Sequence, residues 1–403
     1  MLTYCYLPSW LLALTATALI AYAESNSPGG SHGHSPSQPR CSSVSFHLSA
    51  TAQNLVFSPS PDPNNATQVV DFINLITTTT TNVIVGTQPI SGTFTLNGIY
   101  CAPSSRIKSR NVLQILVHGA TNDAASWSGW NKFGALYNYH LAATGEGYHT
   151  LAIDRLSHGT NPDKPDPVKV VQASLQIELF RELILAVRTS TSSASNPLGK
   201  KFQKIVWVGH SFGSLLGISY ARIHGNNSAV SFNALVATGV SSSMNSTATA
   251  QAFRVTPARL VDPVRFGSLP AAYITVGTER LREQTLYSGN YDPAIPQYDF
   301  AHQDFTTIGE LGGISSTLAP VVGWKKPVMV VTGAEDAIFC VHPSIDPKEC
   351  DKILEKTKTD LFPDLSDSKY EYFAPRKTGH GQGLHYSAPQ QVARIHKFLD
   401  KYF

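Results

Sequence analysis

A serine flanked by two glycines is the residue of this chain best placed to do chemistry. The pentapeptide Gly209-His210-Ser211-Phe212-Gly213 follows an apolar run, 204–208, and precedes an apolar segment, 214–221. The run predicts a buried strand and the segment predicts a helix packed on it. A Gly-x-Ser-x-Gly turn between strand and helix is typical of a nucleophilic serine, because the tight turn exposes the hydroxyl. An incidental serine in a glycine-rich turn is the alternative, which this strand and helix context disfavours.

A nucleophilic serine needs a general base, and that base needs a carboxylate to orient it. In the known fold that carries such a serine turn, the expected chain order is serine, acid, histidine. Asp336 is the predicted acid because it follows the apolar run 327–332, and the neighbouring Glu335 is the reserve. His380 is the predicted base because it follows the run 370–373 in a glycine-rich loop. His385, in the same loop, is its rival.

Acyl transfer also needs hydrogen-bond donors for the negative oxygen of the tetrahedral intermediate. The predicted donors are the backbone N–H of Phe212, directly after the serine, and that of Ala120, in the loop after 112–117. Gly119 would let this loop turn toward the serine. His118 is expected to orient or pack the loop rather than to act as a second base. Asp154, after the next strand, is expected to fix loop structure.

Alternating strands and helices must position these residues, and they fill the chain from residue 111 onward. Strands are predicted at 112–117, 149–153, 204–208, 232–237, 327–332 and 370–373, with an amphipathic helix over 168–189 and a final helix over 389–399. This alternation predicts an α/β fold with a mostly parallel central sheet flanked by helices. The core is therefore expected to comprise 111–240 and 327–403.

Two segments break the alternation. Residues 241–326 are too long for a simple crossover and are rich in aromatic residues. We therefore predict an inserted cap, or lid, that lines a mostly apolar pocket, with most of its aromatic residues packing the cap's own core. Residues 41–110 combine strand-like alternation with a helical pattern over 69–76 and are predicted to form an N-terminal extension.

The first residues predict an exported protein. Residues 1–23 contain no charged side chain and carry an apolar stretch before Ala21-Tyr22-Ala23, which predicts a cleaved signal peptide. A retained membrane anchor is the alternative, but the apolar part is shorter than a spanning helix needs. Residues 24–40 consist largely of Ser, Gly, Pro and His and are predicted to be a disordered leader.

The cysteines left after cleavage agree with export. Their even number implies disulfides, and the simplest pairing joins Cys41 with Cys101 and Cys340 with Cys350. None has the short spacing that zinc sites prefer, so no metal is expected. Three glycosylation sequons point the same way, at Asn65, Asn226 and Asn245.

Composition argues against other classes of protein. The 403 residues are 42% hydrophobic, which suits one large core or two modest ones. The net charge is +3 without a basic stripe or a long run of one sign, so no nucleic-acid partner is indicated. No other stretch could span a bilayer, so no stable membrane anchor is expected. The oligomeric state stays open.

The chain resembles a known fold family in the serine turn, His118-Gly119, the turn from Gly333 to Asp336, and Gly379-His380. Together these motifs resemble the α/β-hydrolase fold. Over roughly 111–403 the chain resembles secreted fungal hydrolases of the group that contains lipases, esterases and epoxide hydrolases. The resemblance implies a Ser211–His380–Asp336 triad and a cap between 241 and 326. Epoxide hydrolases and haloalkane dehalogenases of this fold carry aspartate at the serine position, so the resemblance favours a serine hydrolase.

The leading hypothesis is a secreted serine hydrolase that needs no cofactor. It would open a carboxylic ester of an apolar small molecule through an acyl–Ser211 intermediate. A peptidase, or a C–C or tailoring hydrolase for a bulky apolar secondary metabolite, is the alternative. A non-catalytic binding protein on the same scaffold is a further alternative, which the presence of residues for all three triad roles disfavours.

Overall fold

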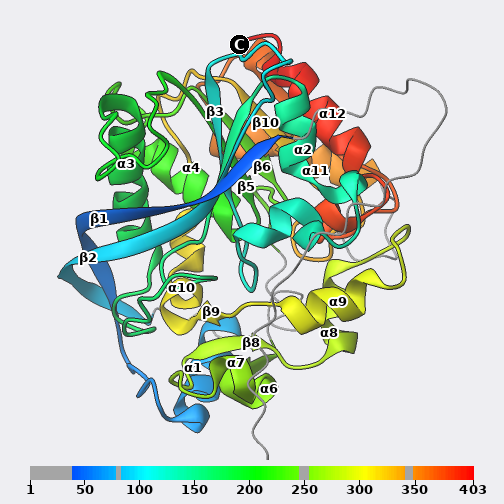
Figure 1. Ribbon diagram of the computed structural model, residues 1–403. Helices are drawn as coiled ribbons and strands as arrows, with labels where there is room; N and C mark the ends of the chain where they lie inside the picture. The colour runs from blue at the N-terminus through cyan, green and yellow to red at the C-terminus, as the bar shows by residue number, and fades with distance from the viewer. Residues whose placement is uncertain (1–38, 79–82, 245–253, 341–347) are drawn as a thin grey trace, which may run out of the picture. The chain divides into compact units, whose positions relative to one another are not determined.

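The computed structural model describes residues 39–78, 83–244, 254–340 and 348–403 (Figure 1). These segments contain all three residues of the predicted triad. The predicted signal peptide, 1–23, lies outside the described residues, as does nearly all of the predicted leader, 24–40. Residues 245–253 of the predicted cap, with the sequon at Asn245, are also outside them.

An eight-stranded sheet carries the fold. Its strands are β1 (Arg40–Phe57), β2 (Ile84–Ala102), β3 (Val112–Val117), β4 (His149–Ile153), β5 (Lys204–His210), β6 (Ala234–Thr238), β10 (Val328–Val331) and β11 (Tyr370–Phe373). They lie in the order β1-β2-β4-β3-β5-β6-β10-β11. The six strands from β4 to β11 in that order pair in parallel, whereas β1 and β2 run antiparallel. The predicted fold class, a mostly parallel sheet flanked by helices, is confirmed.

Helices cover both faces of the sheet, which is why its strands read as continuous apolar runs. The flanking helices are α2 (Tyr139–Gly145), α3 (Ala173–Thr189), α4 (Phe212–His224), α11 (Lys348–Leu361) and α12 (Ala388–Leu399). Ile205 and Trp207 of β5 pack with α3 and α4, while the alternate residues Val206 and Val208 pack with α12. Figure 1 shows α3 and α4 on one side of the sheet and α2 and α12 on the other.

The core also contains short 3-10 turns, and one of its helices begins later than predicted. The turns are η1 (Ala124–Asn131), η2 (Ala135–Tyr137), η4 (Asp367–Lys369) and η5 (Gln382–Leu384). The helix predicted over 168–189 begins at Ala173. The reason lies in Asp166, whose carboxylate accepts hydrogen bonds from the N–H groups of Val168 and Lys169 and closes a separate turn first.

The predicted N-terminal extension, 41–110, supplies β1 and β2 to the same sheet, with β2 paired to β4. In the sequence, helix α1 (Ala66–Thr78) connects these two strands. In the register of β1 and β2, Cys41 stands opposite Cys101, and the two sulfurs are 2.05 Å apart. The sulfurs of Cys340 and Cys350 are 1.94 Å apart. Both predicted cysteine pairs therefore lie at disulfide distance.

The insertion between β6 and β10 has its own small sheet, β7-β8-β9. We call residues 254–326 the cap; they form β7 (Val255–Pro257), α6 (Ala258–Val261), α7 (Pro263–Phe266), β8 (Tyr273–Val276), α8 (Glu279–Leu286), α9 (Ile295–His302), β9 (Thr306–Thr307), α10 (Ile308–Gly312) and η3 (Ile314–Thr317). Phe266, Tyr273 and Phe305 pack against one another within it. A second cluster joins the cap to Phe57 of β1 and to α1, so the cap and the N-terminal segment share a core.

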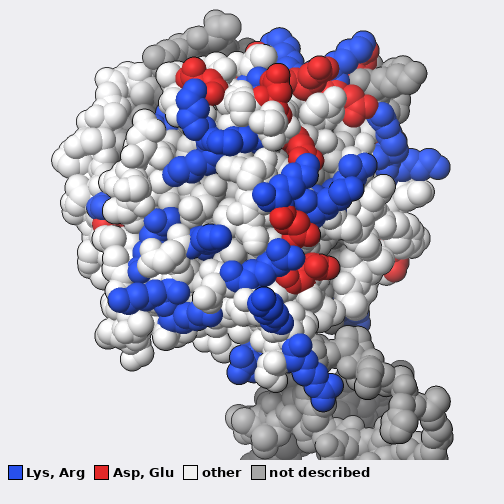
Figure 2. Space-filling view, turned by 90° about the horizontal axis from the view of Figure 1, so that it is seen from above, with Lys and Arg blue, Asp and Glu red and all other residues white. Residues whose placement is uncertain are grey.

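Surface charge is relevant to nucleic-acid binding, and the length and hydrophobicity of the helices are relevant to membrane insertion. Figure 2 views the molecule from above; most of this face is uncharged, and among its charged residues Lys and Arg cover more of the surface than Asp and Glu. In this view the positive charge does not form the continuous stripe that a nucleic-acid backbone would follow. In the described segments, no helix has both the length and the apolar character that crossing a membrane requires.

Candidate active site

Ser211 occupies a strained turn between β5 and α4. Its backbone has φ 52° and ψ −119°, a region that residues with a side chain rarely adopt. A Cβ on Gly213 would lie 2.0 Å from the carbonyl oxygen of Val117, and one on Gly209 would lie 2.5 Å from the backbone of Gly213. Both glycines are therefore required by close backbone contact, which explains the pentapeptide in physical terms.

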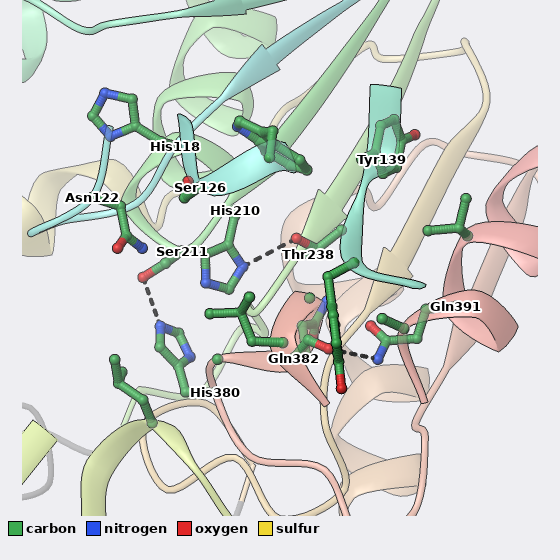
Figure 3. Close-up of a pocket in the computed structure, with 18 of the residues that line it drawn as sticks. His118, Asn122, Ser126, Tyr139, His210, Ser211, Thr238, His380, Gln382 and Gln391 are labelled. Atoms are coloured by element: carbon green, nitrogen blue, oxygen red, sulfur yellow. Dashed lines mark hydrogen bonds between the residues drawn. The ribbon is translucent and has the colours of Figure 1, made fainter. Parts of the chain in front are cut away.

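The predicted nucleophile, base and acid lie in one chain of hydrogen bonds. The Nε2 atom of His380 is 2.8 Å from the Oγ of Ser211 (Figure 3). Its Nδ1 atom is 2.8 Å from the Oδ2 of Asp336. Asp336 follows β10 and His380 follows β11, so adjacent parallel strands deliver both side chains to the same edge of the sheet. This arrangement meets the geometric requirement for an activated serine.

Asp336 is held as a carboxylate. Burial alone would raise the pKa of Asp336, but the nearby His380 and hydrogen bonds to the carboxylate outweigh it and hold this pKa below its usual value. The other oxygen, Oδ1, accepts hydrogen bonds from the N–H groups of Ile338 and Phe339 at 2.9 and 3.0 Å. A carboxylate there assigns the proton of a neutral His380 to Nδ1 and leaves the lone pair of Nε2 facing Ser211.

The rival histidine, His385, serves the loop rather than the serine. Its Nε2 accepts hydrogen bonds from the N–H groups of Gly379 and Ser288, and its Nδ1 donates to the carbonyl oxygen of Gly381. Burial lowers its pKa to about 4, so the ring is neutral. The reserve acid Glu335 accepts a hydrogen bond from Ser288 of the cap instead of reaching His380. The structure thus separates His380 from its rival by the partners of each ring.

The loop after β3, residues 118–122, carries the predicted donor at Ala120; this segment, called the oxyanion loop, lies directly against Ser211. A Cβ on Gly119 would be 3.0 Å from the Cβ of Ser211. The Nδ1–H of His118 donates to the Gly119 carbonyl oxygen at 2.9 Å, and burial lowers the pKa of His118 well below its usual value. His118 is therefore a neutral residue that orients the loop. Ala120 lines the cavity, and Phe212 is the first residue of α4, where N–H groups lack an intrahelical acceptor.

Asp154 does fix loop structure, as its position suggested. Its carboxylate accepts hydrogen bonds from the N–H groups of Ala124 and Thr160 and from the hydroxyl of Thr160. These bonds tie the segment after β3 to the segment after β4. Asp154 therefore holds the residues that directly follow the loop carrying Ala120.

His210 was not anticipated as part of the site. Its ring lies 5.1 Å from that of His380, and its Nδ1 is 3.2 Å from the hydroxyl of Thr238 (Figure 3). Burial, and then the neighbouring His380, lower the pKa of His210 to about 3. His210 is therefore a neutral wall beside the base. It stands in the serine pentapeptide, but nothing in the residue type signals this contact.

A cavity of about 560 Å³ opens at Ser211. It extends from the serine past Tyr139 and Gln391 toward α2 and α12 (Figure 3). Of the aromatic residues expected in the cap, Tyr287 lines it. The cap also contributes Val276, Arg282, Thr285, Leu286 and Asp299, and the core contributes aliphatic and aromatic residues that include Trp127, Leu136, Tyr137, Ile338, Leu384, Val392 and Ile395.

Within the described residues, no three His, Cys, Asp or Glu side chains are grouped so that they could hold a metal ion. The two predicted sequons that are described, at Asn65 and Asn226, lie on exposed residues. Asn65 also accepts hydrogen bonds from the N–H groups of Thr67 and Gln68 at the start of α1.

Comparison with known proteins links the chain to a family. Residues 114–395 match the Alpha/beta hydrolase family. No curated protein matches the sequence. A soluble variant of monoglyceride lipase from Saccharomyces cerevisiae, solved with a substrate analogue, has a TM-score of 0.51 at 15% identity, covering 76% of this chain and 92% of that one.

Two further solved structures match the chain with lower TM-scores. The peroxisomal alpha-beta-hydrolase Lpx1 from Saccharomyces cerevisiae has a TM-score of 0.47 at 13% identity and covers 91% of both chains. An esterase from a Rhodococcus species has a TM-score of 0.43 at 16% identity, covering 76% of this chain and 95% of that one. At such identities the likeness concerns the fold alone.

Proposed function

This chain belongs to the alpha/beta hydrolase family, and we propose that it is a serine hydrolase that cleaves carboxylic esters. The observation that carries the proposal is the chain of hydrogen bonds from Asp336 through His380 to Ser211, at the edge of an apolar cavity. A serine in a strained turn, a histidine with its lone pair toward the hydroxyl and a buried carboxylate are what nucleophilic acyl transfer needs.

The reaction would run in two halves on these residues. Ser211 Oγ attacks the ester carbonyl carbon while His380 Nε2 takes the hydroxyl proton, and Asp336 stabilises the imidazolium that forms. The N–H groups of Phe212 and Ala120 bind the negative oxygen of the tetrahedral intermediate. His380 then gives the proton to the leaving alkoxide. A water molecule, deprotonated by His380, hydrolyses the acyl–Ser211 ester and regenerates the enzyme.

The size and lining of the cavity favour a small apolar ester over a polypeptide. About 560 Å³ holds a drug-sized molecule, and the walls are largely aliphatic and aromatic. At one end, residues near the surface of two core helices line it: half-buried Ala142 of α2, exposed Glu146 directly after that helix, and exposed Pro389 and Ala393 of α12. We call this end of the cavity the groove. We infer that an elongated apolar part of the substrate lies along the groove, with the ester carbonyl at Ser211.

Bulky substitutions at the groove test this substrate class. Ala142→Trp and Ala393→Trp should lower kcat/KM for a p-nitrophenyl dodecanoate at least about tenfold and leave the acetate within about twofold, because the short ester does not reach α2 and α12. Gln390→Trp, an exposed residue of α12 that does not line the cavity, is the matched control. If neither groove variant changed the dependence of kcat/KM on acyl chain length, the substrate would not bind along α2 and α12.

Covalent labelling tests the enzyme class itself. A fluorophosphonate probe should label the wild type at Ser211 and should fail to label Ser211→Ala and His380→Ala. Ser214→Ala is the control, because Ser214 is buried and its hydroxyl donates to the carbonyl oxygen of Thr238 instead of facing the cavity. Labelling that survives in Ser211→Ala would refute the nucleophile. A panel of esters, peptides and 1,3-diketones then separates an esterase from a peptidase and from a C–C hydrolase.

We also propose that the protein is exported. Two cysteine pairs at disulfide distance support this, because such bonds persist in oxidising compartments. The predicted signal peptide, 1–23, lies outside the described residues. Protein recovered from culture medium should begin at Glu24 and carry glycans at Asn65 and Asn226; a cell-retained protein that begins at Met1 would contradict the proposal.

A further inference from the structure

A buried ion pair links the cap to the core beside the oxyanion loop. Arg155 follows β4, and Glu310 belongs to α10 of the cap; both side chains have no exposed surface. Nη1 of Arg155 donates to Oε1 of Glu310, whose other oxygen accepts the hydroxyl of Thr306 at 2.9 Å. Burial alone would raise the pKa of Glu310, but Arg155 and then His158 hold it well below its usual value. Glu310 is therefore a charged partner that keeps Arg155 in place.

Arg155 in turn holds the backbone of the oxyanion loop. Its Nε donates to the carbonyl oxygen of His118 at 3.1 Å, and its Nη2 donates to that of Gly119 at 3.2 Å. The same Gly119 oxygen accepts the Nδ1–H of His118. The Gly119 carbonyl and the Ala120 N–H belong to one planar trans peptide, so they point in opposite directions. Holding this carbonyl therefore sets the direction of the Ala120 N–H.

A second cap residue holds the other end of the same loop. Arg282 of α8 is fully buried and donates to both oxygens of Asp299, each at 2.7 Å. Its Nη1 donates to the hydroxyl of Thr121 at 2.8 Å, and its Nη2 donates to Oδ1 of Asn122 at 3.1 Å. Thr121 has φ 58°, a conformation that its branched side chain disfavours. The loop thus keeps a strained residue directly after Ala120 because the cap supplies its partners.

The geometry points to Glu310 and Arg282 as positioning residues for the oxyanion donor at Ala120, which makes the cap a fixed part of the catalytic site. This inference rests on the proposed ester hydrolysis. Glu310 acts on the loop through Arg155, and Arg282 acts on it directly. Other contacts agree with a fixed cap: the N–H of Gly381, beside the base, donates to the carbonyl oxygen of Leu286 at 2.7 Å.

A purely structural role of the two charge pairs makes a different prediction. If they only fastened the cap, their loss would reduce the amount of active enzyme and would affect every substrate alike. A misdirected Ala120 N–H instead weakens the binding of the developing oxyanion at each turnover. An ester and its thionoester separate these cases, because a thiolate-like sulfur is a poor hydrogen-bond acceptor and gains little from the donor.

The test uses Glu310→Gln and Arg282→Lys, with active sites counted by fluorophosphonate titration. Per active site, kcat for the oxygen ester should fall about 10- to 100-fold with KM within twofold, and kcat for the matched thionoester should fall less than threefold. Arg188→Lys is the control, since this half-buried arginine donates to Ser228, Ser231 and Asn233, outside the cap and the loop. Unchanged kcat, or equal losses on both esters, would overturn the inference. Glu310→Asp replaces Glu310→Gln should the latter not fold.

Hydrogen exchange gives a readout that does not depend on the reaction. Peptides spanning 113–124 should exchange at least about tenfold faster in both cap variants than in the wild type, while peptides of β5 and α4 keep wild-type rates. If residues 113–124 exchanged at the wild-type rate in both variants, the positioning role of Glu310 and Arg282 would be refuted, whatever the substrate is. Faster exchange in a protein whose wild type cleaves no ester would instead reject the proposed function and leave the cap's hold on the loop intact.

Discussion

Asp336→Asn is the sharpest perturbation of the proposed triad, because it changes a charge without changing shape. In the structure, Oδ1 accepts two backbone N–H groups, from Ile338 and Phe339, and Oδ2 faces Nδ1 of His380. An asparagine must keep its oxygen toward the two N–H groups, since its NH₂ would oppose them with two donors. The NH₂ group then faces Nδ1 of His380, which becomes an acceptor.

The size of the effect follows from that reversal. With its proton moved to Nε2, a neutral His380 no longer offers a lone pair to Ser211, and the imidazolium loses its counter-charge. The same exchange in a serine protease triad lowers kcat by about 10⁴, which corresponds to about 5.5 kcal/mol in the barrier. We expect a loss of about this size, with KM within about threefold.

The assay is steady-state hydrolysis of a p-nitrophenyl ester at pH 7.5, with circular dichroism and thermal unfolding to establish that the variant folds. Glu335→Gln is the matched control, because it removes the same charge one residue away, from a carboxylate bonded to Ser288. It should retain at least about a third of the wild-type kcat. Should Asp336→Asn keep more than about a tenth of wild-type kcat, the proposed role of Asp336 and the tautomer argument would both fail.

Three further predictions concern stability and the turn. Gly213→Ala should abolish turnover, since its Cβ would lie 2.0 Å from a backbone oxygen, whereas Gly145→Ala, with no atom within 4 Å, should behave as wild type in the same assay. Burial lowers the pKa of His396 to about 4, so the unfolded chain binds its proton first and stability falls from pH 6.5 toward 4 by up to about 1.4 kcal/mol per pH unit; urea unfolding at pH 7 and 5 should show a smaller loss for His396→Gln. Replacing Cys41 and Cys101 by serine opens a loop of 60 residues and should cost up to about 4 kcal/mol, measured as a lower Tm with unchanged kcat at 25 °C.

Local patterns predicted the core of this fold well. The strands expected at 112–117, 149–153 and 370–373 have those bounds, and the other three core strands agree within two residues at each end. A strand of a parallel sheet is buried on both faces and flanked by turns, so its apolar run marks it without reference to the rest of the chain. The glycines of the serine turn are equally local, because the contacts that exclude a side chain arise from the turn itself and the neighbouring strand.

The sequence favoured His380 over His385 as the base, but it could not exclude His385. The two histidines are five residues apart in one glycine-rich loop, and both are buried. The structure separates them through bonds to distant residues: one ring faces Asp336 and Ser211, and the other holds Gly379, Gly381 and a cap N–H. Hydrogen-bond partners of this kind depend on where strands and the cap come together, which no local pattern records.

The cap's hold on the oxyanion loop was likewise invisible. Thr307 and Glu310 have the spacing of a helix capping box, which the structure contains. That local role gives no sign that Glu310 also pairs with Arg155, 155 positions earlier. Nor does the helical context of Arg282 point to Thr121 and Asn122.

The sequence by itself determined the sheet, the strained serine turn and the order of nucleophile, acid and base, because backbone sterics and the burial of apolar side chains act over a few residues. Tertiary structure decided which histidine faces Ser211, and that β1 and β2 join the central sheet. It also decided that two cap residues hold the loop carrying Ala120. These outcomes depend on charges and hydrogen-bonding groups from distant segments, which find their partners only when the chain has folded.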